Sequence, residues 1–299
     1  MALGLAVAFL GAGPPPSRTS PESATTLRMQ VLLDRARFSP GEIDGTPGSN
    51  SSRALAAYTA ARGLDPGEAA FWAASSGDAT PTLVVYTLTE NDLAAITESE
   101  IPEDMMEKAK LDGLGYAWAI EALGEKFHAS PGLLRRLNPQ ASWTQAGESV
   151  EVPNVRMDLP TDKVARVIVD ESDLAVLTVG ADGRVFSRYP ASLGSARDPL
   201  PCGEWKIQGV RQNPPFFYNP DLFWDADESH AKARIAPGPN NPVGVVWIDL
   251  SKPHFGIHGT PEPSAIGKTQ SHGCIRLTNW DAAELASLVS PGMSVVLQE

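Results

Sequence analysis

Short β-prone segments dominate residues 163–299, and they limit what this part of the chain can fold into. Each segment is rich in Val, Ile, Thr or aromatic residues, and Gly, Pro and Asp turn signals separate it from the next. The segments are 164–170, 174–179, 185–191, 203–208, 243–250, 255–258 and 293–297. One helix is clear, because Thr278 or Asn279 can cap apolar residues that continue to Val289. The pattern predicts a mainly β domain, either a β-sandwich or a barrel-like sheet, with one or two helices.

A chemical motif lies inside this β-rich domain. His258 precedes a Ser-His-Gly-Cys-Ile-Arg run at residues 271–276, so a thiol, two imidazoles and a guanidinium lie close together in sequence. A free cysteine has a pKa of about 8.5 and needs a neighbouring histidine to hold or take its proton at neutral pH. His258 can supply this base if adjacent strands, or a strand and a loop, bring it to Cys274. The motif therefore predicts a cysteine acyl-transfer enzyme.

This pattern resembles the signature of the L,D-transpeptidase catalytic domain of the YkuD type, in which an upstream histidine precedes Ser-His-Gly-Cys and, commonly, Ile-Arg. The resemblance covers about Lys163 to Gln298, and Ile266-Gly267 also matches in order and spacing. It implies a YkuD-type β-sandwich and a bacterial enzyme that remodels peptidoglycan. Such an enzyme takes the acyl group of a tetrapeptide stem and passes it to an amine, which forms a 3-3 cross-link or attaches a protein.

The resemblance also implies roles for single residues. Cys274 would attack the carbonyl of the third stem residue and release D-alanine, while His258 takes the thiol proton and returns it to the leaving amine. The backbone carbonyl of Gly259 would orient His258, and the backbone N–H groups of Gly273 and Cys274 would form the oxyanion hole. The residues expected to bind or support the substrate are Arg276, His272 and Ser271. No cofactor and no metal are expected, because no HExxH or paired-cysteine spacing accompanies the histidines.

Alternatives remain for the function. Water could replace the amine, which would give an L,D-carboxypeptidase or endopeptidase, and a degenerate relative could bind the wall without catalysis. Intact Cys274 and His258 count against the last alternative. The other cysteine, Cys202, is expected to be free and not catalytic, because a disulfide to Cys274 would consume the nucleophile. The resemblance further implies that a carbapenem would acylate Cys274.

Two further units are expected before the catalytic domain at 163–299. Residues 25–75 have apolar residues at helical spacing, and they resemble a small all-α peptidoglycan-binding domain through the Phe-Ser-Pro-Gly-Glu-Ile-Asp-Gly turn at 38–45. The alternative is a helical cap that binds nothing. Residues 83–156 resemble an α+β LysM module with a long, acidic insertion between its halves, and we interpret this unit as a LysM-like linker that sets the reach of the catalytic domain.

Residues 212–241 are predicted as a long loop that contains five aromatic residues. These aromatic side chains either form a lid over the active-site cleft or make the packing core of the loop itself.

Charge and the N-terminus limit the partners and the location. The formal net charge of −12 argues against nucleic acid and against an anionic lipid surface, because both need clustered Lys and Arg. Residues 1–20 are predicted as a signal or export segment. Their apolar stretch resembles the hydrophobic region of a signal peptide and is too short to span a membrane, and the basic residues that usually precede this region are missing. The expected protein is exported, periplasmic or cell-wall-associated, with no membrane span in the mature chain. Its expected partners are peptidoglycan stem peptides and glycan strands.

Overall fold

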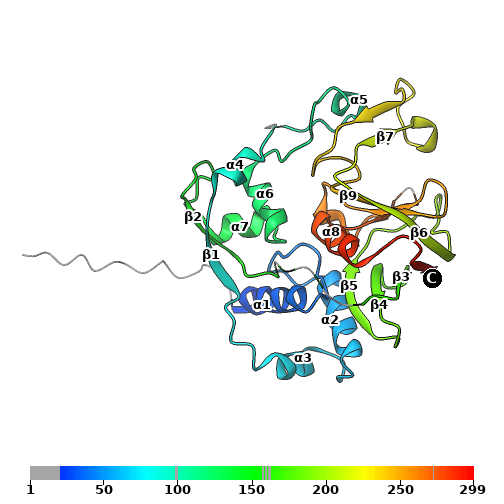
Figure 1. The fold of residues 1–299 in the computed structure, drawn as a ribbon. Coiled ribbons are helices and arrows are strands. Elements are labelled where there is room, and N and C mark those ends of the chain that lie inside the picture. Colours follow the sequence, from blue (N-terminus) through cyan, green and yellow to red (C-terminus); the bar gives the residue numbers. More distant parts are fainter. Residues whose placement is uncertain (1–20, 98–99, 157, 159, 161–162, 272) are drawn as a thin grey trace, which may run out of the picture.

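The computed structural model describes residues 21–97, 100–156, 158, 160, 163–271 and 273–299. The predicted export segment at 1–20 and the proposed substrate contact His272 lie outside these residues. Two N-terminal units pack against a β-rich domain formed by the second half of the chain (Figure 1). No helix within the described residues is long and apolar enough to cross a membrane.

The first unit is a helical cluster, as the spacing of apolar residues predicts. Its helices are α1 (Pro21–Arg35), α2 (Ser49–Ala61) and α3 (Glu68–Ser75). Phe38 and Phe71 are almost fully buried in the shared core of these helices. The ring of Tyr58 makes edge contacts with both, with centroids 5.5 Å and 5.4 Å away. Peptidoglycan binding by this unit stays a prediction.

The middle unit brings together the two halves of the predicted LysM-like segment. Its main elements are β1 (Leu83–Thr87), α4 (Glu90–Ala94), α6 (Ala119–Lys126), α7 (Pro131–Leu137) and β2 (Ser149–Pro153). Strands β1 and β2 pair antiparallel, with Leu83 opposite Pro153. Leu123 and Leu133 of the two longer helices are fully buried in one apolar core with Val152 of this strand pair. The assignment of the unit to the LysM modules stays a prediction.

The catalytic half folds around one eight-stranded sheet with the order β11-β10-β9-β6-β12-β3-β4-β5. Its strands are β3 (Arg166–Asp170), β4 (Ala175–Val179), β5 (Val185–Pro190), β6 (Gly203–Gln212), β9 (Val246–Leu250), β10 (Gly256–His258), β11 (Ile275–Arg276) and β12 (Ser294–Gln298). The register of β6 against β9 shifts between Ile207 and Gly209, and such a bulge increases local twist. A bridge between Ser192 and Arg276 links the end of β5 to β11, so the sheet curves back toward itself.

The predicted mainly β domain is confirmed, but its layers differ from a sandwich of two separate sheets. One bent sheet provides both walls of the core, because β6 is long enough to pair with β12 along one part and with β9 along the other. The predicted helix is α8 (Asn279–Leu288), and the Thr278 side chain caps it by accepting a hydrogen bond from the Asp281 N–H. Leu285 of this helix is fully buried in the core of the sheet.

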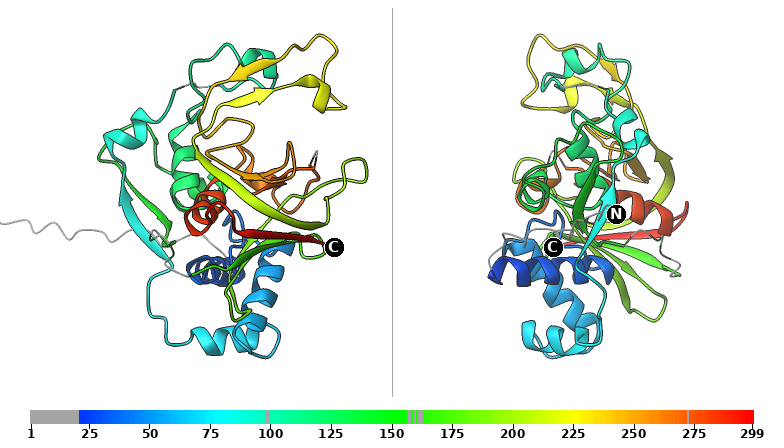
Figure 2. Two further views of the ribbon diagram at one scale, coloured as in Figure 1. Left: turned by 45° about the vertical axis from the view of Figure 1, so that its right-hand side comes forward. Right: turned by 90° about the vertical axis from the view of Figure 1, so that its left-hand side faces the viewer.

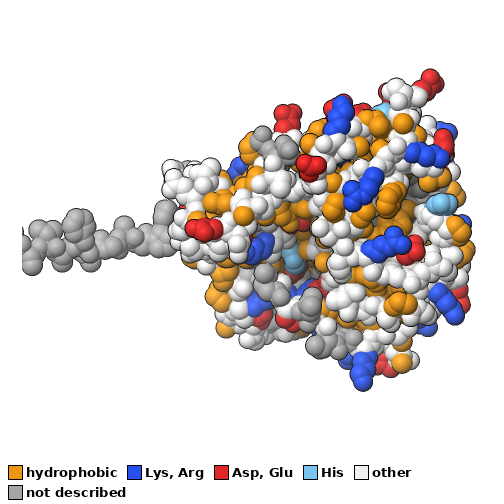
Figure 3. Space-filling model, turned by 45° about the horizontal axis from the view of Figure 1, so that its top comes forward, with side chains coloured by type: hydrophobic (Ala, Val, Ile, Leu, Met, Phe, Trp, Pro, Cys, Tyr) orange, Lys and Arg blue, Asp and Glu red, His pale blue; other side chains and the backbone are white. Residues whose placement is uncertain are grey.

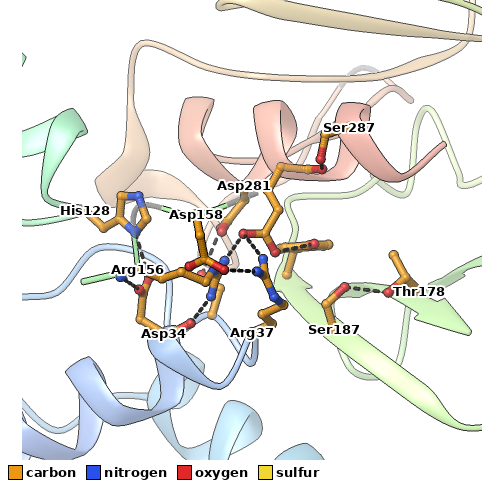
Figure 4. Close-up of polar contacts among 12 residues, drawn as sticks. Asp34, Arg37, His128, Arg156, Asp158, Thr178, Ser187, Asp281 and Ser287 are labelled. Carbon is orange, nitrogen blue, oxygen red and sulfur yellow. Dashed lines mark hydrogen bonds and ion pairs between the residues drawn. The ribbon is translucent and has the colours of Figure 1, made fainter. Parts of the chain in front are cut away.

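A buried polar cluster joins the three units (Figure 4). Arg37, just after α1, and Arg156, just after the middle unit, both form ion pairs with Glu284 of α8. Asp34 of α1 lies 2.7 Å from Nδ1 of His128, which belongs to the middle unit. Buried charges of this kind are tolerated only when they are paired, so the cluster fixes how the units pack on one another.

The turn that suggested peptidoglycan binding is part of this junction. The N–H of Ser39 donates to the carbonyl of Arg188 at 2.8 Å, and the N–H of Ile43 donates to the carbonyl of His128 at 2.7 Å. Phe38 and Ile43 are almost completely buried. The backbone and apolar side chains of this turn are therefore used to dock the helical unit onto the other two units.

The predicted long loop at 212–241 contains a hairpin, which the sequence analysis missed. Its strands are β7 (Phe216–Tyr218) and β8 (Ala233–Ile235), and the insertion of the middle unit, with the short helix α5 (Met105–Lys108), packs against it. Both views in Figure 2 show α5 and the hairpin side by side. Tyr218 and Ile235 are buried in a shared apolar cluster with Leu114 of the insertion. The hairpin therefore has its own packing core, which the middle unit completes.

Candidate active site

Two short parallel strands bring the segments of the predicted base and nucleophile together. In β10 and β11, Ile257 pairs with Ile275 and His258 pairs with Arg276. Both isoleucines are fully buried in the core. Side chains alternate along a strand, so His258 and Arg276 lie on the face opposite these isoleucines. The packing of two core residues thus puts the imidazole and the guanidinium on one face, and Cys274 is the residue directly before β11.

His258 is held as a neutral base. Its Nδ1 lies 2.7 Å from the carbonyl oxygen of Gly259. A carbonyl only accepts hydrogen bonds, so Nδ1 carries the proton and Nε2 keeps its lone pair. Burial lowers the pKa of His258 to about 4, assisted by the charge of Arg276 and opposed by the bond to Gly259. The imidazole is therefore neutral at pH 7, and Nε2 can accept a proton.

Trp247 of β9, which the sequence analysis missed, holds the ring of His258 from one side. The two residues lie opposite each other in the ladder, and their rings stack with centroids 5.5 Å apart and an interplanar angle of 18°. Gly256 leaves room for the indole, because a Cβ at this position would lie 2.5 Å from Cζ2 of Trp247. An imidazole that is stacked on one side and hydrogen-bonded at Nδ1 has little freedom to rotate.

Cys274, immediately before β11, is a protonated thiol at neutral pH. Its Sγ–H donates to the carbonyl of His254 at 3.7 Å, and the described residues show no hydrogen bond from Cys274 to His258. Burial raises the pKa of Cys274, while the N–H of Gly256 and the charge of Arg276 act in the opposite direction. The resting pair is thus thiol and imidazole, and the proton would move as the sulfur attacks.

Ser271 and Gly273 shape the turn before the nucleophile. The Ser271 hydroxyl donates to the Cys274 carbonyl at 2.6 Å and accepts from the Gly273 N–H at 3.2 Å. Gly273 has a φ of +101°, and a Cβ there would lie 3.1 Å from the ring of Phe255. The Gly273 N–H predicted for the oxyanion hole is therefore already bonded to Ser271. The hydroxyl of Ser271, a residue predicted to contact substrate, makes these two hydrogen bonds within the turn, and the Ser271 N–H donates to the Leu193 carbonyl at 2.8 Å.

Arg276 lies half-buried beside the thiol. One of its guanidinium nitrogens donates to the Gln270 carbonyl, and its backbone exchanges two hydrogen bonds with Ser192, at 2.9 Å and 3.0 Å. Burial lowers the pKa of Arg276, and the charge of Glu262 opposes this effect. In the part of the chain that the structure describes, its Nε is buried without a hydrogen-bond partner. A buried guanidinium on this face is suited to an anionic group of a substrate.

The segment around the hairpin reaches the edge of the site. The Trp224 Nε1–H donates to a carboxylate oxygen of Asp198 at 2.9 Å, and the guanidinium of Arg197 lies 4.5 Å from the centroid of the Trp224 ring. The Cβ of Asp198 is 4.0 Å from where a Cβ on Gly273 would be, so this contact lies next to the nucleophile turn. The surface turned toward the viewer in Figure 3 carries hydrophobic side chains between scattered basic and acidic ones. A lid over the active-site cleft, formed by residues 212–241, stays a prediction.

Both cysteines are free, as predicted, with Cys202 exposed and Cys274 half-buried. Among the described residues, to which His272 does not belong, no group of three or more His, Cys, Asp or Glu side chains could hold a metal ion.

Comparison with known proteins supports the sequence resemblance. A family model, the L,D-transpeptidase catalytic domain YkuD, matches residues 165–297. A putative L,D-transpeptidase YkuD of Bacillus subtilis is 32% identical over 181 residues, which cover 60% of this chain and 92% of that protein. A second one, from Bacillus licheniformis, is 33% identical over 178 residues, covering 59% of this chain and 91% of the relative. Both alignments are longer than the segment from residue 165 to residue 299, so each of them also includes residues before 165.

Solved structures include an L,D-transpeptidase from Mycobacterium smegmatis, 20% identical with a TM-score of 0.37, for which the match covers 51% of this chain and 64% of that one. L,D-transpeptidase 3 from Mycobacterium tuberculosis is 17% identical with a TM-score of 0.38, over 52% of this chain and 76% of that one. The near-complete coverage of the Bacillus subtilis relative decides the family. This protein belongs to the YkuD family of L,D-transpeptidases.

Proposed function

We propose that the protein is a peptidoglycan L,D-transpeptidase in which Cys274 is the nucleophile and His258 is the base. The observation that carries this proposal is a neutral imidazole, fixed through Nδ1 by Gly259, on a strand that pairs in parallel with the strand directly after Cys274. Family membership supports the class of reaction. The proposed partners are peptidoglycan stem peptides and glycan strands, and this substrate implies an exported, periplasmic or cell-wall-associated protein.

In the acylation step, Nε2 of His258 takes the thiol proton while Sγ of Cys274 attacks the carbonyl carbon of the third stem residue. The carbonyl oxygen becomes an oxyanion. Collapse of the tetrahedral intermediate breaks the bond to D-alanine, and the imidazolium gives its proton to the departing amine. The product of this step is a thioester on Cys274, and His258 is neutral again.

In the transfer step, an acceptor amine attacks the thioester carbon and His258 takes a proton from the amine. Collapse then expels the sulfur, which recovers its proton from the imidazolium. An acceptor amine from a second stem gives a 3-3 cross-link, and an amine on a protein gives an attached protein. Two moderate barriers replace one high barrier, which is the advantage of covalent catalysis.

Charge stabilisation in these steps would come from the nucleophile turn and from Arg276. The Cys274 N–H is the donor that we assign to the oxyanion, and the Gly273 N–H could join it only by leaving the hydroxyl of Ser271. The guanidinium of Arg276 would bind a carboxylate of the stem. The helical unit and the middle unit would hold the catalytic domain in place, since the turn at 38–45 is buried in their junction.

The test uses the full-length protein with a purified disaccharide-tetrapeptide, alone and with an acceptor that carries a diaminopimelate amine, followed by intact mass spectrometry. We expect an acyl group on Cys274, release of D-alanine and a 3-3 dimer. The matched variants are Cys274→Ala, which should fold and lose the adduct, and Cys202→Ala, which should keep it because this thiol is exposed and lies outside the motif at 271–276. A carbapenem should also form an adduct on Cys274.

The other outcomes separate the alternatives. A tripeptide without a dimer would indicate hydrolysis, and hence an L,D-carboxypeptidase or endopeptidase. Neither adduct nor product on folded protein would overturn the proposal and favour a wall-binding protein without catalysis. Turnover that survives in Cys274→Ala would show that this residue is not the nucleophile.

A further inference from the structure

A hydrogen bond and a packing contact connect the middle unit to the backbone that orients His258. We propose that Glu125 of α6 and Asn279 of α8 are positioning residues for His258. In this arrangement Glu125 holds the side-chain amide of Asn279, and Asn279 fixes the backbone of Gly259, whose carbonyl orients the imidazole. The inference deepens the proposed function and rests on it, and it gives the middle unit a part in building the active site.

The first step of the path is the contact between Asn279 and Gly259. The Asn279 side chain is almost completely buried, and its Oδ1 accepts the N–H of Val245 at 3.2 Å. A Cβ on Gly259 would lie 2.2 Å from this oxygen, and a Cβ on Gly244 would lie 2.0 Å from it. The amide therefore packs directly against both glycine backbones. Because Gly259 carries the oxygen that fixes Nδ1 of His258, a displaced Asn279 would displace that oxygen too.

The second step is the bond from Asn279 to Glu125. Nδ2 of Asn279 donates to Oε1 of Glu125 at 2.6 Å and to the Pro239 carbonyl at 3.2 Å. The other carboxyl oxygen of Glu125 accepts the Tyr116 hydroxyl at 3.4 Å. Helix α6, from the middle unit, lies beside α8 of the catalytic domain (Figures 1 and 2). The amide that braces the base is thus held partly from another unit of the protein.

The protonation of Glu125 makes the path testable. Desolvation and the charge of Glu121 raise the pKa of Glu125 to about 8, although hydrogen bonds from Asn279 and Tyr116 oppose the shift. The carboxyl is therefore mostly neutral at pH 7. Glutamine has the shape of the neutral acid and keeps an oxygen for Asn279, whereas leucine fills a similar volume without an acceptor. These two substitutions separate the hydrogen bond from the packing.

The kinetic test follows the acylation rate of Cys274 by the tetrapeptide donor between pH 3 and pH 8 in the full-length protein. Asn279→Ala should lower the rate by about tenfold to a hundredfold, because misplacing a catalytic group by about 1 Å costs about a hundredfold. The low-pH limb of its rate profile should also move to lower pH, because the Gly259 carbonyl raises the pKa of His258 and its displacement removes that effect. Glu125→Leu should change the rate and the low-pH limb in the same direction by smaller amounts, since the Pro239 carbonyl still accepts a hydrogen bond from Asn279. Glu125→Gln should keep the rate and the limb.

Nitrogen-15 NMR of the His258 imidazole provides a readout that does not depend on turnover. The wild-type protein and Glu125→Gln should show the Nδ1–H tautomer, and Glu125→Leu and Asn279→Ala should show a mixture. Arg276, the charged group that acts on the pKa of His258, is unchanged in these variants. Changes in tautomer therefore report the position of the ring and not a new charge.

Asn240→Ala is the matched control. Asn240 donates to Oε1 of Glu121 at 2.7 Å, so it joins the same helix to the catalytic domain without reaching Gly259. This variant should leave the tautomer and the low-pH limb of His258 unchanged.

Any of three results on folded protein would overturn the inference. The first is an unchanged His258 tautomer in Glu125→Leu, and the second is an equal loss of acylation rate in Glu125→Gln and Glu125→Leu. The third is an Asn240→Ala variant with the same change of tautomer and rate as Asn279→Ala. If Glu125→Leu does not fold, Asn279→Ala decides by the same readouts. A wild-type protein that forms no thioester would refute the proposed function, while the NMR series would still decide whether Glu125 and Asn279 position His258.

Discussion

Replacement of Arg276 by glutamine should raise the pKa of His258 and of Cys274, the two groups proposed to be catalytic. The guanidinium lowers the pKa of His258, because it disfavours a second positive charge, and lowers the pKa of Cys274, because it favours the thiolate. Loss of a charge close to a titratable group moves its pKa by on the order of one unit. A plot of thiol reactivity against pH should have a low-pH limb set by the pKa of His258 and a high-pH limb set by the pKa of Cys274. A variant that removes Arg276 should therefore move both limbs to higher pH.

The size of the effect follows from the pKa of His258. With a pKa of about 4, about 97% of the imidazole is neutral at pH 5.5, whereas the ordinary value of 6.5 would leave about 9%. The wild-type protein should therefore keep its base at pH 5.5, a roughly tenfold advantage over an unperturbed histidine. An upward shift of about one unit in the Arg276→Gln variant would cut the neutral fraction at pH 4.5 by about threefold.

The assay is alkylation of Cys274 by iodoacetamide from pH 3 to pH 11, read by mass spectrometry in a Cys202→Ala background with a single thiol. This reagent is uncharged, so the loss of Arg276 cannot act through binding of a carboxylate. Lys252→Gln is the control, because it removes a positive charge that lies over the Phe255 ring. The reasoning is refuted by a wild-type low-pH limb near 6.5, or by an Arg276→Gln variant in which neither limb moves.

Two further predictions concern the junction and the indole. Arg156→Ala should lower the free energy of unfolding by about 3–5 kcal/mol, because it leaves Glu284 buried with one cation fewer, and a loss below about 1 kcal/mol in urea denaturation would contradict this. Gly256→Ala should cost about 1–3 kcal/mol and slow acylation, because its Cβ would force Trp247 away from His258. Unchanged stability together with an unchanged acylation rate would show that the stack is dispensable.

Local patterns explain which parts of the fold were predictable. The β-prone runs correspond to β3, β4, β5, β6, β9, β10 and β12, because alternating or apolar β-branched residues between turn signals report strand structure directly. The helix after Thr278 was equally visible, since its cap and its Pro-Gly stop are local. Strand β11 was missed because two residues carry no periodicity. The hairpin at 212–241 was missed because its strands are short and its core is shared with a distant insertion.

The motif residues alone identify the chemical groups proposed to react. The order of His258, Gly259 and Cys274 and the resemblance that this order carries indicate a thiol and its base, because the motif is a fixed spacing of residue types along the chain. Burial and protonation were not visible at that level. A neutral His258 depends on its desolvation, and desolvation is a property of the packed interior.

The contacts that hold the His258 imidazole come from the packing of elements that are separate in sequence. Trp247, Glu125 and Asn279 belong to no motif, and they meet the His258–Gly259 segment because β9, α6 and α8 converge on it from separate parts of the chain. Stacking and hydrogen bonds act over a few ångströms of space whatever the separation in sequence. A single sequence therefore names the reacting groups, and the folded chain determines the contacts that orient them.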